Sequence, residues 1–165
     1  MTDAPPGAAW TAGDRFPTLA ARDLEGRNCT LPDALTGEWN LVVLAFRRQQ
    51  QSTVDTWSAW QREVVVDRPG LECWEVPVIG VLWAPARRFI DGGMAQAVRE
   101  VEARRHTLTV YTHLATAARA LDITDTGTVT PMLVDRAGRI RWRGSGAPDG
   151  RAGADILALV DAPAG

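Results

Sequence analysis

Apolar and polar residues along this chain fall into short segments whose spacing alternates between strand-like and helix-like. Leu41–Phe46 is a continuous apolar run of strand length, which is typical of a strand covered on both faces. From Ser52 to Val65 the apolar residues follow helical spacing and predict a helix. A second apolar strand is predicted over 76–83, and a second helix over 85–101 with a proline in its first turn.

Two hairpins are predicted on either side of this central part. The first joins Thr18–Leu24 to Asn28–Leu31, and the second joins Met132–Asp135 to Arg139–Trp142, each through a short turn that contains glycine. The remaining predicted elements are a strand over 106–113, a helix over 115–121 and a final helix over 155–160.

This order of elements predicts an α/β fold, with a mixed central sheet flanked by helices and an N-terminal β-hairpin extension. Residues 1–17 are predicted to be an extended lead-in, because their prolines and glycines oppose helix. A length of 165 residues suits one domain, since chains of roughly 150 residues bury about two-thirds of their unfolded surface. We therefore expect 1–165 to form a single domain.

Charge and hydropathy exclude two classes of partner. A net charge of -2 and a pI near 5.7 give no positive field that would attract a phosphate backbone, so nucleic acid is not expected. No apolar run reaches the 18 or so residues that span a bilayer. The N-terminus shows neither a secretory nor a mitochondrial targeting pattern, so the expected location is the cytoplasm.

The two cysteines, Cys29 and Cys73, are far apart and form no Cys-x-x-Cys pair or zinc pattern. They are expected to be reduced and mostly buried. His106 and His113 flank one predicted strand without further ligands at metal spacing. The sequence therefore predicts no metal and no cofactor.

Five short motifs in order resemble the thioredoxin-like fold in its peroxiredoxin and alkyl-hydroperoxide-reductase variety. They are Asp14–Pro17, Leu24–Gly26, Thr130-Pro131, Met132–Asp135 and Arg136–Ile140. The resemblance implies that chemistry would lie in the loop after Leu41–Phe46, where a helix N-terminus lowers a cysteine's pKa. The loop here contains arginine, glutamine, serine and threonine, so dithiol catalysis at that place is excluded.

A second resemblance is to the mitochondrial ATP-synthase assembly factor family. It rests on Phe46–Trp57, on Met132–Asp135 and on Gly138–Gly146, which includes Gly-Arg-Ile-Arg-Trp. That family is thioredoxin-like, lacks the redox pair and attends a newly made membrane subunit of the rotary ATPase. The resemblance implies a bacterial-type relative that binds a polypeptide and is not an enzyme.

The loop after the first central strand supplies most candidate binding residues. Arg47 and Arg48 would hold a small anion or an acidic peptide, or would be solvated side chains at a loop tip. Three glutamines come next in the chain. Their side-chain amides are suited to recognising the main chain of a partner, or they are ordinary loop residues. Ser52 is predicted as the N-cap of the helix and Asp55 as an acid in its first turn. The three glutamines are Gln49, Gln50 and Gln51.

Two further candidates lie near the C-terminus. Thr130-Pro131 resembles the cis-proline turn of thioredoxin-like enzymes, and a cis bond there would expose a backbone edge for an extended peptide. Arg139, Arg141 and Arg143 alternate with apolar residues, so three guanidinium groups are predicted on one face, beside Trp142. That face would be a solvated edge or a docking surface for an acidic partner.

Three functions remain open on the sequence. The first is a non-catalytic thioredoxin-like protein that binds polypeptide, as an assembly or chaperone-like factor for a membrane complex such as ATP synthase. The second is an atypical thiol oxidoreductase or peroxidase that uses Cys73 or Cys29, for which one thiol must have a lowered pKa. The third is a dimerising scaffold, since the oligomeric state, a homodimer included, is open.

Overall fold

The computed structural model describes residues 11–80 and 106–163. The helix expected over 85–101, the end of the strand expected over 76–83 and the first ten residues of the lead-in lie outside these ranges.

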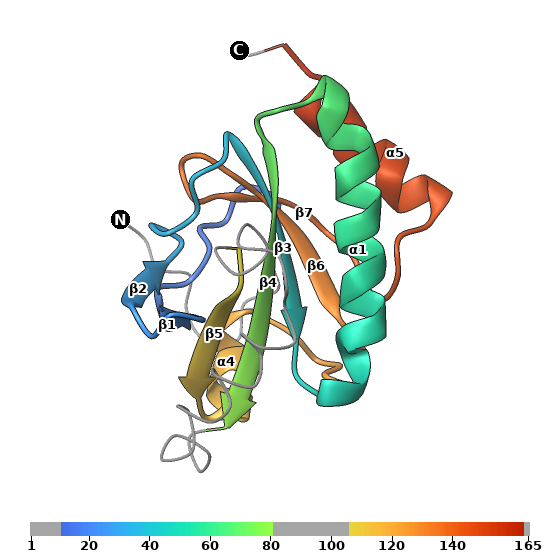
Figure 1. Cartoon of the computed structure of the whole chain (residues 1–165). Helices are drawn as coiled ribbons and strands as arrows, with labels where there is room; N and C mark the ends of the chain where they lie inside the picture. Colours follow the sequence, from blue (N-terminus) through green and yellow to red (C-terminus); the bar gives the residue numbers. More distant parts are fainter. Residues whose placement is uncertain (1–10, 81–105, 164–165) are drawn as a thin grey trace.

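One seven-stranded mixed sheet forms the centre of the described structure, in the order β2-β1-β5-β4-β3-β6-β7 (Figure 1). Strands β3, β4 and β5 run parallel, and the other neighbouring pairs are antiparallel. The bounds are β1 Leu19–Asp23, β2 Asn28–Leu31, β3 Trp39–Ala45, β4 Leu71–Gly80, β5 Leu108–Thr112, β6 Thr130–Asp135 and β7 Ile140–Arg143. The mixed sheet and both predicted hairpins are confirmed.

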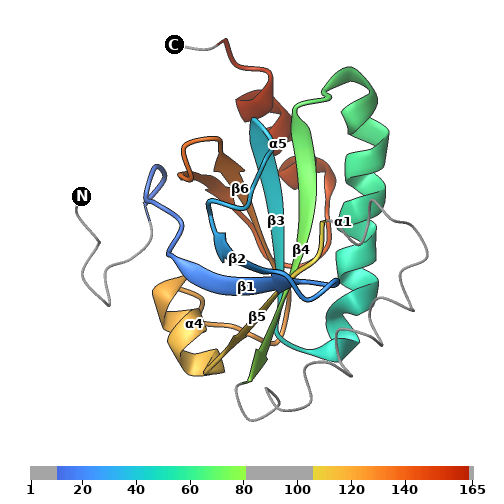
Figure 2. The ribbon, with the colours of Figure 1, turned by 60° about the vertical axis from the view of Figure 1, so that its left-hand side comes forward.

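Helices cover both faces of this sheet, as predicted. The α-helices are α1 Gln51–Val64, α4 Leu114–Ala120 and α5 Gly150–Val160, and the short 3₁₀ helices are η1 Arg48–Gln50 and η2 Val65–Asp67. Figures 1 and 2 show α1 and α5 on one face and α4 on the other. The final helix begins before the predicted Asp155, because the Asp149 carboxylate accepts a hydrogen bond from the Ala152 N–H at 2.7 Å and caps the first turn.

Strand β3 lies at the centre because its side chains are apolar on both faces. Leu41 and Val43 pack into the cluster under α1 and α5, whereas Val42 and Leu44 pack into the cluster on the α4 side. All four are fully buried. A continuous apolar run is what such a strand needs, so this part of the sequence prediction is confirmed.

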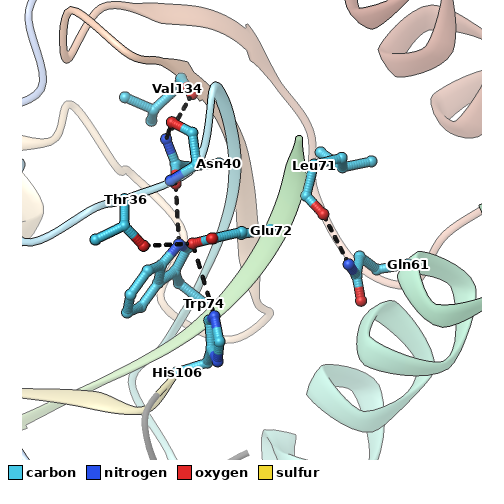
Figure 3. Close-up of polar contacts among 9 residues, drawn as sticks. Thr36, Asn40, Gln61, Leu71, Glu72, Trp74, His106 and Val134 are labelled. Carbon is cyan, nitrogen blue, oxygen red and sulfur yellow. Dashed lines mark hydrogen bonds and ion pairs between the residues drawn. The ribbon is translucent and has the colours of Figure 1, made fainter. Parts of the chain in front are cut away.

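Strand β4 begins at Leu71, earlier than the predicted Val76. It pairs in parallel with the whole of β3, from Trp39 opposite Leu71 to Ala45 opposite Pro77. Its early part carries glutamates, which the apolar pattern could not assign to a strand. Glu72 accepts a hydrogen bond from the Thr36 hydroxyl at 2.7 Å, so its carboxylate has a partner at the end of the sheet (Figure 3).

A buried polar network joins β3 to β4 near this end of the sheet. The Asn40 side chain is completely buried, and its Oδ1 accepts hydrogen bonds from the Gly37 N–H at 2.9 Å and the Trp74 Nε1–H at 3.0 Å. Its Nδ2 donates to the carbonyl oxygens of Gly37 at 3.0 Å and Val134 at 3.4 Å. The ring of His106 packs against Trp74, tilted by 49°, with ring centroids 4.6 Å apart (Figure 3). The network ties the loop before β3 to three strands.

Candidate functional site

The turn between β3 and α1 is where the fold resemblance places a reactive thiol. Here it consists of η1 and its flanking residues, with Arg47, Arg48 and Gln49 exposed and Gln50 buried. Neither cysteine of the chain lies in this turn, since Cys29 is in β2 and Cys73 is in β4. The turn therefore presents guanidinium and carboxamide groups in place of sulfur.

Gln50 organises this turn through its side-chain amide. Its Oε1 accepts hydrogen bonds from the backbone N–H groups of Phe46, at 2.8 Å, and Arg47, at 3.2 Å. Its Nε2 donates to the carbonyl oxygen of Thr126 at 2.9 Å. The sequence left two interpretations of Gln50, recognition of a partner's main chain or an ordinary loop residue. In the structure its main-chain partners belong to its own turn and to the loop before β6, so its carboxamide is not available to a partner.

The predicted capping roles of Ser52 and Asp55 are wrong. Helix α1 continues directly from η1, so Gln50 occupies the N-cap position and the exposed Ser52 lies inside the first turn. Asp55 comes one turn later, and its Oδ1 accepts a hydrogen bond from the exposed Gln51 Nε2 at 2.9 Å. The preceding 3₁₀ turn displaces the helix start from the position that the serine indicated.

A hollow of about 410 Å³ opens beside the turn. Two segments face each other across it, namely the start of α1 with the residues before it and the loop that leads into β6. The lining residues are Arg47, Gln49, Gln50, Thr53, Gly127, Thr128 and Val129. Apart from Val129 and Gly127 they carry hydrogen-bonding side chains, so the hollow suits a polar ligand.

Thr130 and Pro131 do not form the exposed edge that a cis-proline turn would offer. Among the described residues the cis peptide bond is Leu31–Pro32, and the Thr130–Pro131 bond is not cis. Both residues are buried at the start of β6, where Thr130 pairs with Leu44 of β3. On the other side, the Pro131 carbonyl accepts a hydrogen bond from the Gly144 N–H at 2.9 Å. Neighbours on both sides leave no free strand edge at this point.

Arg139, Arg141 and Arg143 do not share one face of the sheet, contrary to the sequence prediction. Ile140 packs in the core cluster on the α4 side and Trp142 in the cluster under α1, because the β6–β7 register shifts by one residue between Leu133 and Val134. The strict alternation expected from the sequence is therefore broken.

Each of these arginines is also bonded within the chain. Arg139 Nη1 donates to the Gly13 carbonyl at 3.0 Å, and Arg141 Nε donates to the Asp135 carboxylate at 2.7 Å. Arg143 donates to the carbonyl oxygens of Leu121 and Asp122, at the end of α4. Trp142 contacts Trp57, with ring centroids 6.1 Å apart. Arg141 and Trp142 thus have structural partners, and their proposed docking role has no support in these contacts.

Neither thiol is activated by its surroundings. Burial raises the pKa of the Cys73 thiol to about 12, and the nearby Glu75 carboxylate adds to this effect. Burial and the Asp23 carboxylate raise the pKa of the Cys29 thiol. Both cysteines are free. Since the thiolate is the nucleophile, the fraction of reactive sulfur near pH 7 is reduced at both positions.

Glu75 is a half-buried acid that the sequence analysis did not select. It lies in β4 facing α1, where its Oε1 accepts a hydrogen bond from the Ser58 hydroxyl at 3.2 Å. Burial is the main reason that its pKa is raised, the Asp55 charge adds to this, and hydrogen bonds from Gln51 and Ser58 oppose it. A glutamate inside a strand of mixed pattern gives no sign of burial, so the sequence alone could not identify it.

The raised pKa of Glu75 predicts a pH-dependent gain from the isosteric substitution Glu75→Gln. The folded state holds this proton more tightly than the unfolded state, so ionising Glu75 destabilises the fold as the pH rises above the ordinary value of 4.5. We expect Glu75→Gln to raise the Tm at pH 7 and to lose this advantage below pH 4.5. Thermal unfolding from pH 4 to 8 measures it, with Glu63→Gln on the exposed side of α1 as a charge-matched control. An equal gain in both variants would contradict the assignment.

Comparison with solved structures identifies the fold. The thioredoxin domain of a thiol-disulfide oxidoreductase from Bacteroides vulgatus is 18% identical, with a TM-score of 0.53 and coverage of 93% of this chain and 100% of that chain. BsSco, described as a member of the Sco family of cytochrome c oxidase assembly proteins, is 11% identical, with a TM-score of 0.60 and coverage of 90% and 92%. A yeast mitochondrial 1-Cys peroxiredoxin is 16% identical, with a TM-score of 0.56 and coverage of 93% and 76%.

These similarities show a thioredoxin-like fold, with thiol-disulfide oxidoreductase, Sco and peroxiredoxin proteins among the structural neighbours. At such low identities they show the fold alone. No protein-family profile matches the chain, and no curated protein sequence matches it.

The described residues contain neither a cluster of metal ligands nor a membrane-spanning helix. In residues 11–80 and 106–163, no three or more His, Cys, Asp or Glu side chains come together as metal ligands would. Within the same ranges, no helix has the length and apolar character needed to cross a membrane.

Proposed function

We propose that this protein is a non-catalytic thioredoxin-like protein that binds polypeptide. The observation that carries the proposal is the turn between β3 and α1. Thioredoxin-like enzymes would use this turn for a thiolate, and here it holds the exposed Arg47, Arg48 and Gln49 beside a polar hollow. The chain keeps the fold, but the turn has no cysteine. In its place the turn carries guanidinium and carboxamide groups, which are suited to hydrogen bonding and charge pairing.

The positions of the two sulfurs support this proposal. Cys29 and Cys73 lie in strands β2 and β4 rather than in the turn, and the pKa of each thiol is raised. A disulfide exchange or peroxide reduction at enzymatic speed needs an accessible thiolate near neutral pH. The alternative function, an atypical thiol oxidoreductase or peroxidase, therefore lacks the activated sulfur on which it depends.

The finer role that we propose is an assembly or chaperone-like one for a membrane complex such as ATP synthase. It is supported by the similarity of Phe46–Trp57 and Gly138–Gly146 to the ATP-synthase assembly factor family. BsSco, which has the same fold, is described as belonging to a family of cytochrome c oxidase assembly proteins. For this chain we accordingly propose a bacterial-type relative of that family. It would act in the cytoplasm as a single domain and bind a protein client.

We expect neither thiol to support catalysis. The wild-type protein should reduce a disulfide substrate or hydrogen peroxide no faster than the Cys29→Ser/Cys73→Ser double variant does. Native protein titrated with a thiol reagent at pH 7 should react slowly at Cys73, since its thiol pKa is about 12. Turnover that the wild type shows and the double variant loses would overturn the proposal in favour of the enzyme.

Polypeptide binding is tested separately by site-specific photocrosslinking in cells of the source organism. A photoreactive residue at the exposed Gln49 should crosslink a reproducible set of proteins. The same residue at Arg136, which is exposed in the turn at the other end of β6, is the matched control. Recovery of ATP-synthase membrane subunits at Gln49 and not at Arg136 supports the assembly role. The same crosslinks at both positions contradict a binding site at the hollow.

A further inference from the structure

The hollow beside the β3–α1 turn has a cationic lining. Of the seven residues that line it, Arg47 is the charged one, and the exposed Arg48 is next to it in the chain. Within residues 11–80 and 106–163, neither guanidinium has an ion pair with a carboxylate of the chain. Arg139, Arg141 and Arg143, by contrast, each donate to a partner inside the molecule.

The two acids closest in the chain to this region are occupied elsewhere. Asp125 Oδ1 accepts a hydrogen bond from the Gly127 N–H at 2.8 Å, which shapes the loop on the far wall of the hollow. Asp55 Oδ1 accepts from Gln51 along α1. Among residues 11–80 and 106–163, neither carboxylate forms an ion pair with Arg47, so the positive charge at the hollow is open to a ligand.

Gln50 decides which groups can meet that ligand. Its carboxamide already binds the N–H groups of Phe46 and Arg47, so these two backbone donors are not available to an anion. A ligand in the hollow would contact side chains, namely the Arg47 guanidinium, the Gln49 carboxamide and the Thr53 hydroxyl. A planar guanidinium pairs best with a carboxylate, whereas an amide and a hydroxyl pair with peptide N–H and C=O groups.

We propose that this hollow binds an extended acidic segment of polypeptide, with an Asp or Glu carboxylate of that segment paired to the Arg47 guanidinium. Gln49 and Thr53 hydrogen-bond to its main chain. This inference rests on the proposed polypeptide binding and adds the chemistry of the segment that is recognised. A volume of about 410 Å³ falls in the range of roughly 300–1,000 Å³ that holds small ligands, so the contact covers a few residues of the segment.

The test compares two synthetic peptides of equal length and sequence, one rich in glutamate and the other with each glutamate replaced by glutamine. Binding to the full chain is measured by fluorescence anisotropy at low salt and at 0.3 M salt. Arg47→Glu is the test variant. Arg136→Glu changes the charge by the same amount at the opposite end of β6 and is its matched control. Thermal unfolding of both variants checks that each is folded.

We expect the acidic peptide to bind the wild type and Arg136→Glu alike, and Arg47→Glu at least about 10-fold more weakly, an effect that salt reduces because the pair is exposed. The glutamine peptide should bind weakly to all three proteins. Equal binding of both peptides, independent of Arg47, would overturn this inference and leave polypeptide binding intact. An equal loss in Arg136→Glu would show attraction by overall charge and would also overturn it. If neither peptide binds, this inference is overturned, and the photocrosslinking at Gln49 decides separately whether the protein binds polypeptide.

Discussion

Trp57→Ala is expected to lower the free energy of unfolding by about 3–5 kcal/mol, the range for removing a large buried aromatic side chain. Trp57 is 1% exposed and packs from α1 against β7 and the loop before α5. Its ring meets those of Trp60 and Trp142 edge-on, with centroids 5.8 Å and 6.1 Å away. Its Nε1–H donates to the Gly146 carbonyl at 2.8 Å, so the substitution also leaves that carbonyl without its donor.

Chemical denaturation measures the effect, and two variants separate its causes. Trp57→Phe keeps an aromatic ring and removes the indole N–H, so its cost should be well below that of Trp57→Ala. Trp60→Ala removes the same side chain from the same helix at a half-buried position. If Trp60→Ala were as destabilising as Trp57→Ala, Trp57 could not be the anchor of α1 on the sheet.

Asn40→Ala is expected to lower the free energy of unfolding by about 2–6 kcal/mol, because it leaves two buried donors without a partner at roughly 1–3 kcal/mol each. These donors are the Gly37 N–H and the Trp74 Nε1–H, both bonded to Asn40 Oδ1 (Figure 3). The side chain is 0% exposed, so water does not replace it without a rearrangement of the loop before β3. Urea unfolding of the single variant gives the total effect.

A double-mutant cycle with Trp74→Phe isolates the indole contact. Trp74→Phe removes the donor, so Asn40→Ala in that background should cost less than in the wild type, by about 1 kcal/mol or more. Additive losses would show that the Asn40–Trp74 hydrogen bond contributes no net stability. The Gly37 contact would then account for what Asn40 supplies.

Local patterning was sufficient for most of the fold. The continuous apolar run of β3 predicted a central strand, and glycines at the two hairpin turns predicted their position, with Gly26 at φ 83° and Gly138 at φ 81°. Helix α1 was predicted over nearly its whole length, since the structure begins it at Gln51 and ends it at Val64, although its N-cap is Gln50 and not the predicted Ser52. These features depend on neighbours close in the chain, which is why the sequence alone identified them.

The candidate site was predicted less well. Arg47 and Gln49 do lie on the hollow, but Gln50 is bonded to Thr126, 76 positions along the chain. No local pattern indicates such a contact. No local pattern indicates the β6–β7 register shift either, which places Ile140 and Trp142 on opposite faces of the sheet. Nor does any local pattern indicate that Pro131 has a neighbouring segment on both sides. The role of a polar residue depends on which distant residues it contacts, whereas the periodicity of apolar residues depends only on the local sequence.

The sequence by itself determined that no cysteine lies in the turn before α1, and so that no thiolate forms at the usual place in this fold. It also determined the order along the chain of the strands and helices that the structure describes, because the period of apolar residues is a local property. Only the tertiary structure decided that both remaining thiols have raised pKa values, that Gln50 takes up the backbone donors of the turn, and that Arg47 is left facing a hollow. Burial and charge pairing depend on which distant segments pack together, and the packing of the whole chain determines that.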